Sequence, residues 1–144
     1  MFLGEFEHTI DDKNRLTLPA RFRDELAAGL VITRGMDGCL YAYPVERWHA
    51  LVESQLGALN LLSRDDRMMQ RYFFSGGAEA VPDRQGRVML PATLVTHAKL
   101  GREVIVAGVH DHLEIWDRTA WREQIADVEG RAEHVAERLA AKRD

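Results

Sequence analysis

The feature that most constrains the fold of this chain is a ten-residue segment that occurs twice. DDKNRLTLPA begins at Asp11 and DRQGRVMLPA begins at Asp83. When the two are stacked without a gap, five positions are identical and two more pair like with like, Asn with Gly and Leu with Val. Internal duplication is therefore the first property to test, because a repeat determines the whole architecture.

The similarity between the two halves continues beyond this segment. An offset of 72 residues also aligns Gly29 with Gly101. An offset of 73 then superimposes VITRGMDGCLYAYPVERW on VIVAGVHDHLEIWDRTAW, and these stretches end on the matched pair Trp48 and Trp121. Matches over some forty residues with a single gap indicate a tandem duplication.

Each half begins with the same predicted hairpin. An opening strand, 5–10 or 78–82, enters a turn that contains Asn14 or Gly86. Asn and Gly are the residue types that best tolerate the left-handed backbone of such turns. The short strands that follow are 15–18 and 87–90, which alternate between apolar and other positions.

The rest of each half predicts a helix, two strands and a closing helix. Pro19 and Pro91 stand where proline fits best, in the first turn of a helix. These helices are expected to end at Gly29 and Gly101. The predicted strands are 30–34, 39–43, 103–107 and 112–116, and the closing helices begin near Pro44 and Asp117.

The order of elements predicts an α+β fold made of two β-turn-β-α-β-β-α units. Each unit alone would be marginally stable, so the two are expected to pack into one core. Between them lies a predicted helix with Ser63 as its N-cap and a hinge at Gly76-Gly77. The expected boundaries are a first repeat at 1–57, a helical linker at 58–77, a second repeat at 78–125 and a C-terminal helical extension at 126–144.

The C-terminal helix carries a stripe of apolar residues with heptad spacing, although Gly130 interrupts it. Two interpretations are open: the stripe packs on its own domain, or it forms a contact between subunits. The stripe consists of Trp121, Ile125, Val128, Ala132, Val135 and Leu139.

Composition excludes several classes of protein. The apolar runs are too short to span a bilayer, and the N-terminal MFLGEFEH lacks the pattern of a secretory signal, so we expect a cytoplasmic protein without a membrane partner. The net charge of −4 argues against broad affinity for nucleic acid. The charge is uneven, however, because 11–23 carries a net +2 and 83–102 a net +3. The repeated segments are basic islands in an acidic chain.

No pattern in the sequence predicts a catalytic or metal site. The chain lacks GxxxxGK[ST], GxGxxG and GxSxG, so no cofactor is expected and an enzyme is the weakest hypothesis. The single cysteine, Cys39, is expected to be a small buried residue. His110 and His112 share a face of a strand but have no second cluster of ligands, so a turn and a strand start explain them better than a metal.

The repeated motif reads D-x-x-[GN]-R-[apolar]-x-L-P-A. Its aspartates, Asp11 and Asp83, are expected to accept backbone N–H groups and orient the loops. Arg15 and Arg87 follow the turns directly, and the residues leave two explanations open, an ion pair with the motif aspartate or contact with DNA. The supporting candidates for DNA contact are Lys13, Arg84, Asn14 and Gly86, and Pro19 and Pro91 complete the structural positions of the motif.

These residues carry a resemblance to a known family. MFLGEFEHTIDDKNRLTLPARFRDEL and DRQGRVMLPATL closely resemble the MraZ family of bacterial transcriptional regulators, whose hallmark is two copies of D-x-x-G-R-x-x-x-P. The resemblance runs from Met1 to about Ile125. The second copy matches the hallmark fully, whereas the first has Asn14 in place of glycine.

The resemblance implies a fold, an assembly and a function. The implied fold is an AbrB-like (SpoVT-type) swapped-hairpin barrel made within one chain, and the implied assembly is a ring, most often an octamer. The implied function is binding of double-stranded DNA through Arg15 and Arg87, at closely spaced direct repeats in the promoter of its own operon. That operon lies at the start of the division and cell-wall gene cluster, and the family acts there generally as a nucleoid-associated repressor. The alternative is a ring-forming structural or adaptor protein that binds a protein partner.

Overall fold

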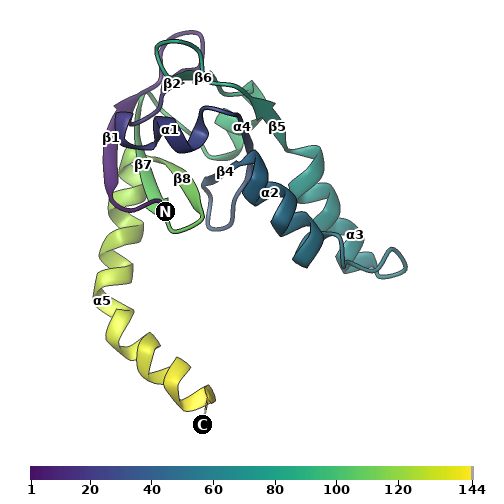
Figure 1. Ribbon diagram of the computed structural model, residues 1–144. Coiled ribbons are helices and arrows are strands. Elements are labelled where there is room, and N and C mark those ends of the chain that lie inside the picture. Colours follow the sequence, from purple (N-terminus) through teal and green to yellow (C-terminus); the bar gives the residue numbers. More distant parts are fainter. Residues whose placement is uncertain (144) are drawn as a thin grey trace.

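The computed structural model describes residues 1–143, so the last residue of the predicted extension 126–144 lies outside the described part. Figure 1 shows a β-rich body from which two helical arms project. One arm contains α2 and α3, and the other is the single long helix α5. Strands β2 and β6 lie at the end of the body opposite to the direction in which α5 projects.

Within residues 1–143, eight strands form two antiparallel sheets. The larger sheet has six strands in the order β1-β7-β8-β4-β3-β5, and the smaller pairs β2 with β6. Their bounds are β1 Glu5–Thr9, β2 Arg15–Thr17, β3 Leu30–Arg34, β4 Leu40–Pro44, β5 Ala78–Ala80, β6 Arg87–Met89, β7 Glu103–Val109 and β8 His112–Asp117.

The two halves of the chain are interleaved in these sheets. The opening strand of each half pairs with a strand of the other half, β1 with β7 and β5 with β3. The halves also meet at the centre of the large sheet, where β4 pairs with β8, and in the small sheet. Neither half has a sheet of its own, which confirms the prediction that the two units share one core.

The core lies on both faces of the large sheet. One large cluster joins the inward residues of β2 and β6 to the inner face of the sheet, where Ile32, Val106 and Leu113 are fully buried. On the opposite face, Trp48 packs with Val31 and Tyr43, and this cluster lies under α2. A matching cluster around Trp116 receives the half-buried Trp121 of α5. The duplicated tryptophans therefore anchor the two closing helices.

The helices follow the prediction in order but differ in length. Pro19, Pro44 and Pro91 are the N-cap residues, with extended backbone one position before the helix starts. The predicted helix 20–28 is a 3₁₀ turn followed by a single α-helical turn. The bounds are α1 Arg23–Leu26, α2 Val45–Leu51, α3 Arg64–Gln70, α4 Ala92–His97 and α5 Arg118–Arg143, and α2 and α3 continue as π-helical turns at Val52–Leu56 and Arg71–Ser75.

The ends of the first helices of the two halves differ. Gly29 has φ 123°, as expected for a residue that terminates a helix. The prediction that Gly101 does the same is wrong, because Lys99 takes the left-handed conformation at φ 51°. The N–H of Leu100 then donates to the carbonyl of Val95 at 3.0 Å, so the left-handed residue that closes the helix lies two positions before the glycine.

The linker helix is capped and fastened to the sheet. Ser63 is its N-cap, and the side-chain Oγ accepts the N–H of Asp66 at 3.3 Å, as predicted. Near Gly76, Thr33 Oγ1 donates to the carbonyl of Phe73 at 2.6 Å. Arg34 Nη1 donates to the carbonyl of Tyr72 at 3.0 Å. Two side chains of β3 therefore hold the end of this arm.

Helix α5 contacts the body only near its start. Arg118 pairs with Glu103, and Trp121 Nε1 donates to Glu5 Oε2 at 3.1 Å. Farther along, Val128 is 45% exposed and Leu139 is 51% exposed, so the interpretation that the stripe packs on its own domain is wrong for this part. Gly130 does not interrupt the helix. Within residues 1–143, no helix combines the length and the apolar character needed to cross a membrane.

Candidate nucleic-acid interface

The structure brings the two copies of the repeated motif together at one end of the body. The motif loops 11–14 and 83–86 lead into β2 and β6, which pair in antiparallel register with Leu16 opposite Val88 (Figure 1). We call the two loops the first and second motif loops, and β2 with β6 the motif ribbon. Residues separated by 72 positions in the chain therefore form one continuous surface.

Each motif aspartate organises its own loop. In the first loop, Asp11 Oδ1 accepts the backbone N–H groups of Lys13 at 2.9 Å and Arg15 at 2.8 Å. In the second loop, Asp83 Oδ1 accepts those of Gln85 and Arg87, both at 2.9 Å. The predicted role of the aspartates as acceptors of backbone N–H groups is confirmed.

Each aspartate also pairs with the motif arginine of its loop. Arg15 Nε lies 2.7 Å from Asp11 Oδ2, and Arg87 Nε lies 2.8 Å from Asp83 Oδ2. The backbone N–H of Arg15 contributes most to lowering the pKa of Asp11, and the side chain of Arg15 adds to it. The same groups of Arg87 lower the pKa of Asp83. Both carboxyl groups are therefore ionised at neutral pH and hold the guanidinium groups through charge-assisted bonds.

The ion pairs use only one edge of each guanidinium. Within residues 1–143, the terminal Nη nitrogens of Arg15 and Arg87 take part in no hydrogen bond or ion pair. Both side chains are 30% exposed. The ion pair expected as one alternative is thus present, and it leaves four N–H donors of each guanidinium free for a ligand.

The two arginines share the outer face of the motif ribbon. Leu16 and Val88 point into the core, with 0% and 2% exposure. Because side chains alternate along a strand, Arg15 and Arg87 point the other way. Arg15 lies opposite Met89, two positions from Arg87, which places the two arginines on a diagonal of the ribbon about 7–8 Å apart.

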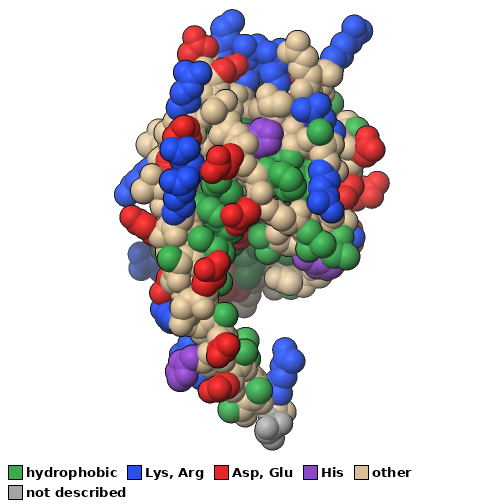
Figure 2. Space-filling view, turned by 90° about the vertical axis from the view of Figure 1, so that its left-hand side faces the viewer, with side chains coloured by type: hydrophobic (Ala, Val, Ile, Leu, Met, Phe, Trp, Pro, Cys, Tyr) green, Lys and Arg blue, Asp and Glu red, His purple; other side chains and the backbone are tan. Residues whose placement is uncertain are grey.

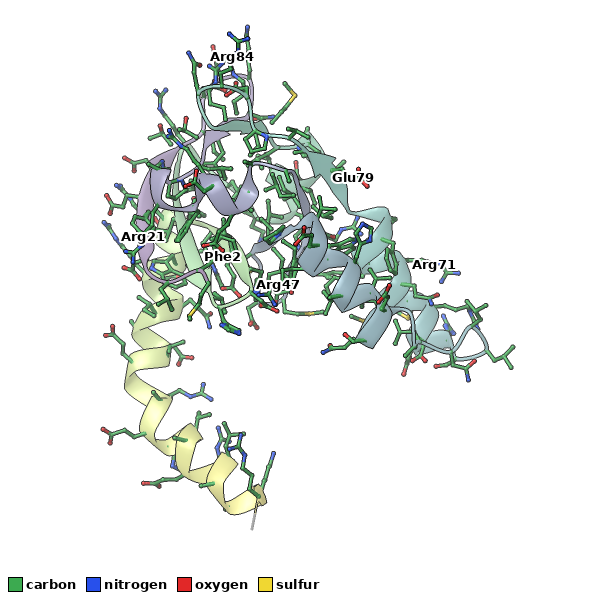
Figure 3. All side chains as sticks on the ribbon, in the orientation of Figure 1. Phe2, Arg21, Arg47, Arg71, Glu79 and Arg84 are labelled. Carbon is green, nitrogen blue, oxygen red and sulfur yellow. The ribbon has the colours of Figure 1, made fainter. Side chains whose placement is uncertain are left out.

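The tips of the motif loops add two more cations. Lys13 and Arg84 are exposed, and Figure 3 shows Arg84 pointing away from the body at the tip. Figure 2 shows Lys and Arg side chains gathered at this end of the molecule. Arg21 belongs to the first basic island of the sequence but lies on the side of the body, away from the loops (Figure 3). The basic surface at the loops therefore contains fewer residues than the two basic segments of the sequence, 11–23 and 83–102.

Asn14 and Gly86 occupy the left-handed positions predicted for them, with φ 57° and 76°. Each also binds the other half of the chain through its carbonyl. Leu90 N–H donates to Asn14, and Leu18 N–H donates to Gly86, both at 2.8 Å. The turns are thus part of the pairing between the two halves, which fixes the loops relative to each other.

Sequence reasoning missed Arg23, which lies behind the second motif loop. Its Nε donates to the carbonyl of Leu18 at 3.1 Å. A Cβ built on Gly86 would lie 2.5 Å from that Nε, so the arginine covers this glycine closely. The residue that aligns with Arg23 in the second half is Val95, which lines an open groove of about 310 Å³ beside Asn14. This difference between aligned positions was visible in the sequence.

The other residues considered in the sequence, Cys39, His110 and His112, have surroundings that account for them by structure alone. Cys39 is fully buried, as predicted, and burial raises the pKa of its thiol. His110 lies between β7 and β8 with φ 66° and pairs with Phe2, and His112 starts β8 and stacks on Tyr43 with ring centroids 4.8 Å apart. Within residues 1–143, no three His, Cys, Asp or Glu side chains gather as they would around a metal ion.

Fold and surface together define an internally duplicated α+β protein that presents paired, arginine-bearing loops at one end. Comparison with known proteins gives the family. The family model described as "MraZ protein, putative antitoxin-like" matches residues 1–72 and again residues 73–143. The chain belongs to the MraZ family.

Curated relatives match over nearly the whole chain. The protein named "Transcriptional regulator MraZ" of Moorella thermoacetica is 47% identical over 139 residues, which cover 96% of each chain. The protein of the same name from a Roseiflexus species is 46% identical over 140 residues, or 97% of each chain. That from Limosilactobacillus fermentum is 50% identical over 121 residues, or 84% of each chain.

Proposed function

We propose that this chain is a transcriptional regulator that binds double-stranded DNA through the motif loops and the motif ribbon. The observation that carries the proposal is the pair of arginines on one outer face, each with its Nε held by an aspartate and its Nη nitrogens free. The names of the relatives, which are transcriptional regulators, support the same class of function.

The shape and chemistry of this surface suit a DNA groove. The major groove admits a two-stranded β-ribbon, and arginine is the side chain that most often reads guanine there. A guanidinium oriented by a carboxylate enters the groove with little loss of side-chain freedom. Lys13 and Arg84 at the exposed tips lie where the phosphate backbone would pass, and they would add affinity that depends on salt.

A gel-shift experiment with DNA from upstream of the chain's own gene tests this proposal. The double variant Arg15→Ala/Arg87→Ala should lose specific binding in moderate salt and keep its fold by circular dichroism. Arg47→Ala/Arg71→Ala is the matched control, because it removes the same charge from exposed positions away from the loops (Figure 3). Full affinity of the loop variant would refute the proposal.

We further propose that the chain works as a ring-shaped homo-oligomer, with the exposed stripe of α5 as a contact between subunits. Val128 and Leu139 are large apolar side chains in water, and the helix that carries them has no body of its own to cover them. A ring of subunits, each binding one short direct repeat, would gain affinity through avidity. This agrees with the modest charge of one chain.

Light scattering coupled to size exclusion tests this assembly. Val128→Lys/Val135→Lys places charges on the stripe and should reduce the oligomer mass. Ala126→Lys/His134→Lys adds two lysines on the opposite side of the same helix and should leave the mass unchanged. An unchanged mass in the first variant would exclude the stripe as the contact.

The finer parts of the proposal concern the fold and the operator. The interleaved strands of the two halves are consistent with an AbrB-like swapped hairpin formed within one chain. The proposed targets are direct repeats in the promoter of its own operon in the division and cell-wall gene cluster, with repression as the outcome and the nucleoid as the location. Footprinting on the upstream DNA would give the operator and its spacing together. If the oligomer instead binds a protein partner with no preference for these repeats, the adaptor alternative is correct.

A further inference from the structure

The two motif loops make matching hydrogen bonds, but different side chains lie behind their turn residues. Arg23 belongs to the first half but lies behind the second motif loop, over Gly86. Gly86 is buried, whereas its counterpart Asn14 is only partly so. At the position matching Arg23, Val95 has no donor to offer a carbonyl and lies beside an open groove.

We propose that Arg23 is a positioning residue for the second motif loop and makes it the stronger of the two DNA-binding loops. This inference rests on the proposed function of the loops. It concerns a residue outside the repeated motif, and it predicts that the two copies contribute unequally although their ion pairs are the same.

The first argument is geometric. Leu18 is bound on both sides, because its N–H donates to the Gly86 carbonyl at 2.8 Å and its carbonyl accepts Arg23 Nε at 3.1 Å. The guanidinium therefore holds Leu18, which is bonded to the second loop, and lies against Gly86 of that loop. A loop held from behind loses less conformational freedom when it binds DNA, which favours affinity.

The second argument is electrostatic. Counted together with its motif arginine, the first loop has Lys13 and Arg15 against two aspartates, Asp11 and Asp12, so the formal charge is zero. The second loop carries Arg84 and Arg87 against Asp83 alone, and Arg23 lies directly behind it. Arg102 lines the groove of the first loop and offsets part of this difference. With Arg102 and Arg23 counted, the formal charge is +1 at the first loop and +2 at the second.

The sequence difference at the turn follows from the same contact. A side chain at position 86 would meet the Nε of Arg23 at 2.5 Å and its Cδ and Cζ at 2.9 Å. Only glycine leaves the guanidinium in place. At position 14 the backing residue is the shorter Val95 with a groove next to it, so asparagine is accommodated. Glycine at 86 and arginine at 23 therefore form a matched pair.

The test uses exchanges between the two copies, with a duplex from upstream of the chain's own gene as the probe. Arg23→Val, which gives the second loop the backing of the first, should weaken binding about tenfold, equivalent to about 1.4 kcal/mol. Arg23→Lys keeps the charge but lacks the planar guanidinium, so it should recover only the electrostatic part of the loss and still bind more weakly than the wild type. Wild-type affinity of Arg23→Lys would show a simple charge effect and overturn the proposal.

A double-mutant cycle separates positioning from general destabilisation. Gly86→Asn should weaken DNA binding in the wild-type background, and it should add little in the Arg23→Val background, where its side chain has room. Additive losses would overturn the matched pair. The reverse exchange, Asn14→Gly/Val95→Arg, should strengthen binding by the first loop several-fold, measured in the Arg87→Ala background.

The failure of this inference is distinguishable from the failure of the proposed function. If the wild-type chain shows no specific binding to the upstream duplex, the DNA-binding proposal itself is wrong. If the wild type binds and Arg23→Val binds equally well while remaining folded by circular dichroism, only the role of Arg23 is wrong.

Discussion

The two motif loops make the same hydrogen bonds but stand on different supports. In each, an aspartate accepts two backbone N–H groups and the Nε of an arginine. Behind the second loop lies Arg23, and behind the first lies Val95 with an open groove. Duplication has preserved the residues that shape the loops, while the residues that support them differ. The repeated motif alone therefore does not determine how firmly either loop is held.

The closing helices of the two halves show the same contrast on a larger scale. Trp48 and Trp121 align in the sequence and pack on matching clusters of the outer face of the sheet. After Trp48, however, the chain turns back through α3 to β5, which pairs with β3, whereas after Trp121 it continues as one long helix away from the body (Figure 1). The equivalent residues Trp48 and Trp121 thus hold an arm that returns to the sheet in the first half and an arm that extends away from the body in the second.

Alanine at the two tryptophans should give the largest difference between the halves. Trp48 is 9% exposed and packs against Tyr43 and Phe74, so Trp48→Ala should lower the free energy of unfolding by about 3–5 kcal/mol. Trp121 is only half-buried and its indole N–H bonds an exposed carboxylate, so Trp121→Ala should cost about 1–2 kcal/mol. Urea unfolding followed by circular dichroism measures both. Equal losses would mean that α5 is held more firmly than its contacts indicate.

Substitutions at the left-handed positions test the difference between the loops directly. Gly86→Ala should destabilise the protein by about 1–2 kcal/mol, because φ is 76° and the new Cβ displaces the guanidinium of Arg23. Asn14→Ala should cost less, since asparagine already carries a Cβ at φ 57°. Thermal unfolding of the two variants compares them. A larger loss at position 14 would contradict the proposed support of the second loop.

The arrangement around these loops shows how far the sequence could predict the structure. The β-branched or apolar residues Leu16 and Val88 between outward-facing neighbours, and the Asn or Gly at the turn, predict the ribbon because these preferences are local. Ser63 was likewise recognisable as an N-cap. The contact between Arg23 and Gly86 was not predictable, because it joins different halves and depends on how α1 meets the opposite loop.

Two other features escaped prediction for related reasons. Lys99 ends α4 in place of Gly101, because bonds to the carbonyls of Val95 and Thr96 outweigh the small preference for glycine. The partners of the opening strands, β7 for β1 and β3 for β5, are not encoded in the strands' own patterns. An alternating strand shows which face is buried but not which neighbour it pairs with.

Gly130 offers a smaller test of the free arm. It lies inside α5, and a Cβ there would meet nothing within 4 Å. Gly130→Ala should therefore stabilise the helix by about 0.5–1 kcal/mol and raise the helical signal in circular dichroism. Position 130 lies on the side of α5 opposite the apolar stripe, so the oligomer mass should not change. A weaker helical signal or a smaller oligomer mass would show that Gly130 is in contact with another part of the assembly.

The smallest expected effect concerns the centre of the sheet, where His112 in the second half aligns with Cys39 in the first. Burial lowers the pKa of His112, but the Glu114 and Asp111 carboxylates outweigh it, and the pKa is raised above its ordinary value of 6.5. Nδ1 lies 2.8 Å from Asp111 Oδ1, and Nε2 lies at a longer 3.8 Å from Glu114 Oε2. The imidazolium is therefore stabilised by folding.

The sign of the pH dependence follows from this raised pKa. A group whose pKa is higher in the folded than in the unfolded state contributes stability below its unfolded pKa, and this contribution is lost as the pH rises through the folded pKa. The free energy of unfolding should thus fall from pH 6 toward alkaline values in the wild type, and fall less steeply in His112→Gln. Urea titrations at several pH values measure both slopes. The carboxylates that raise the pKa of His112 belong to its own turn and strand, and the Cys39 thiol of the unfolded chain ionises only above about pH 8, so a Cys39→Ala variant should leave the slope below that pH unaltered.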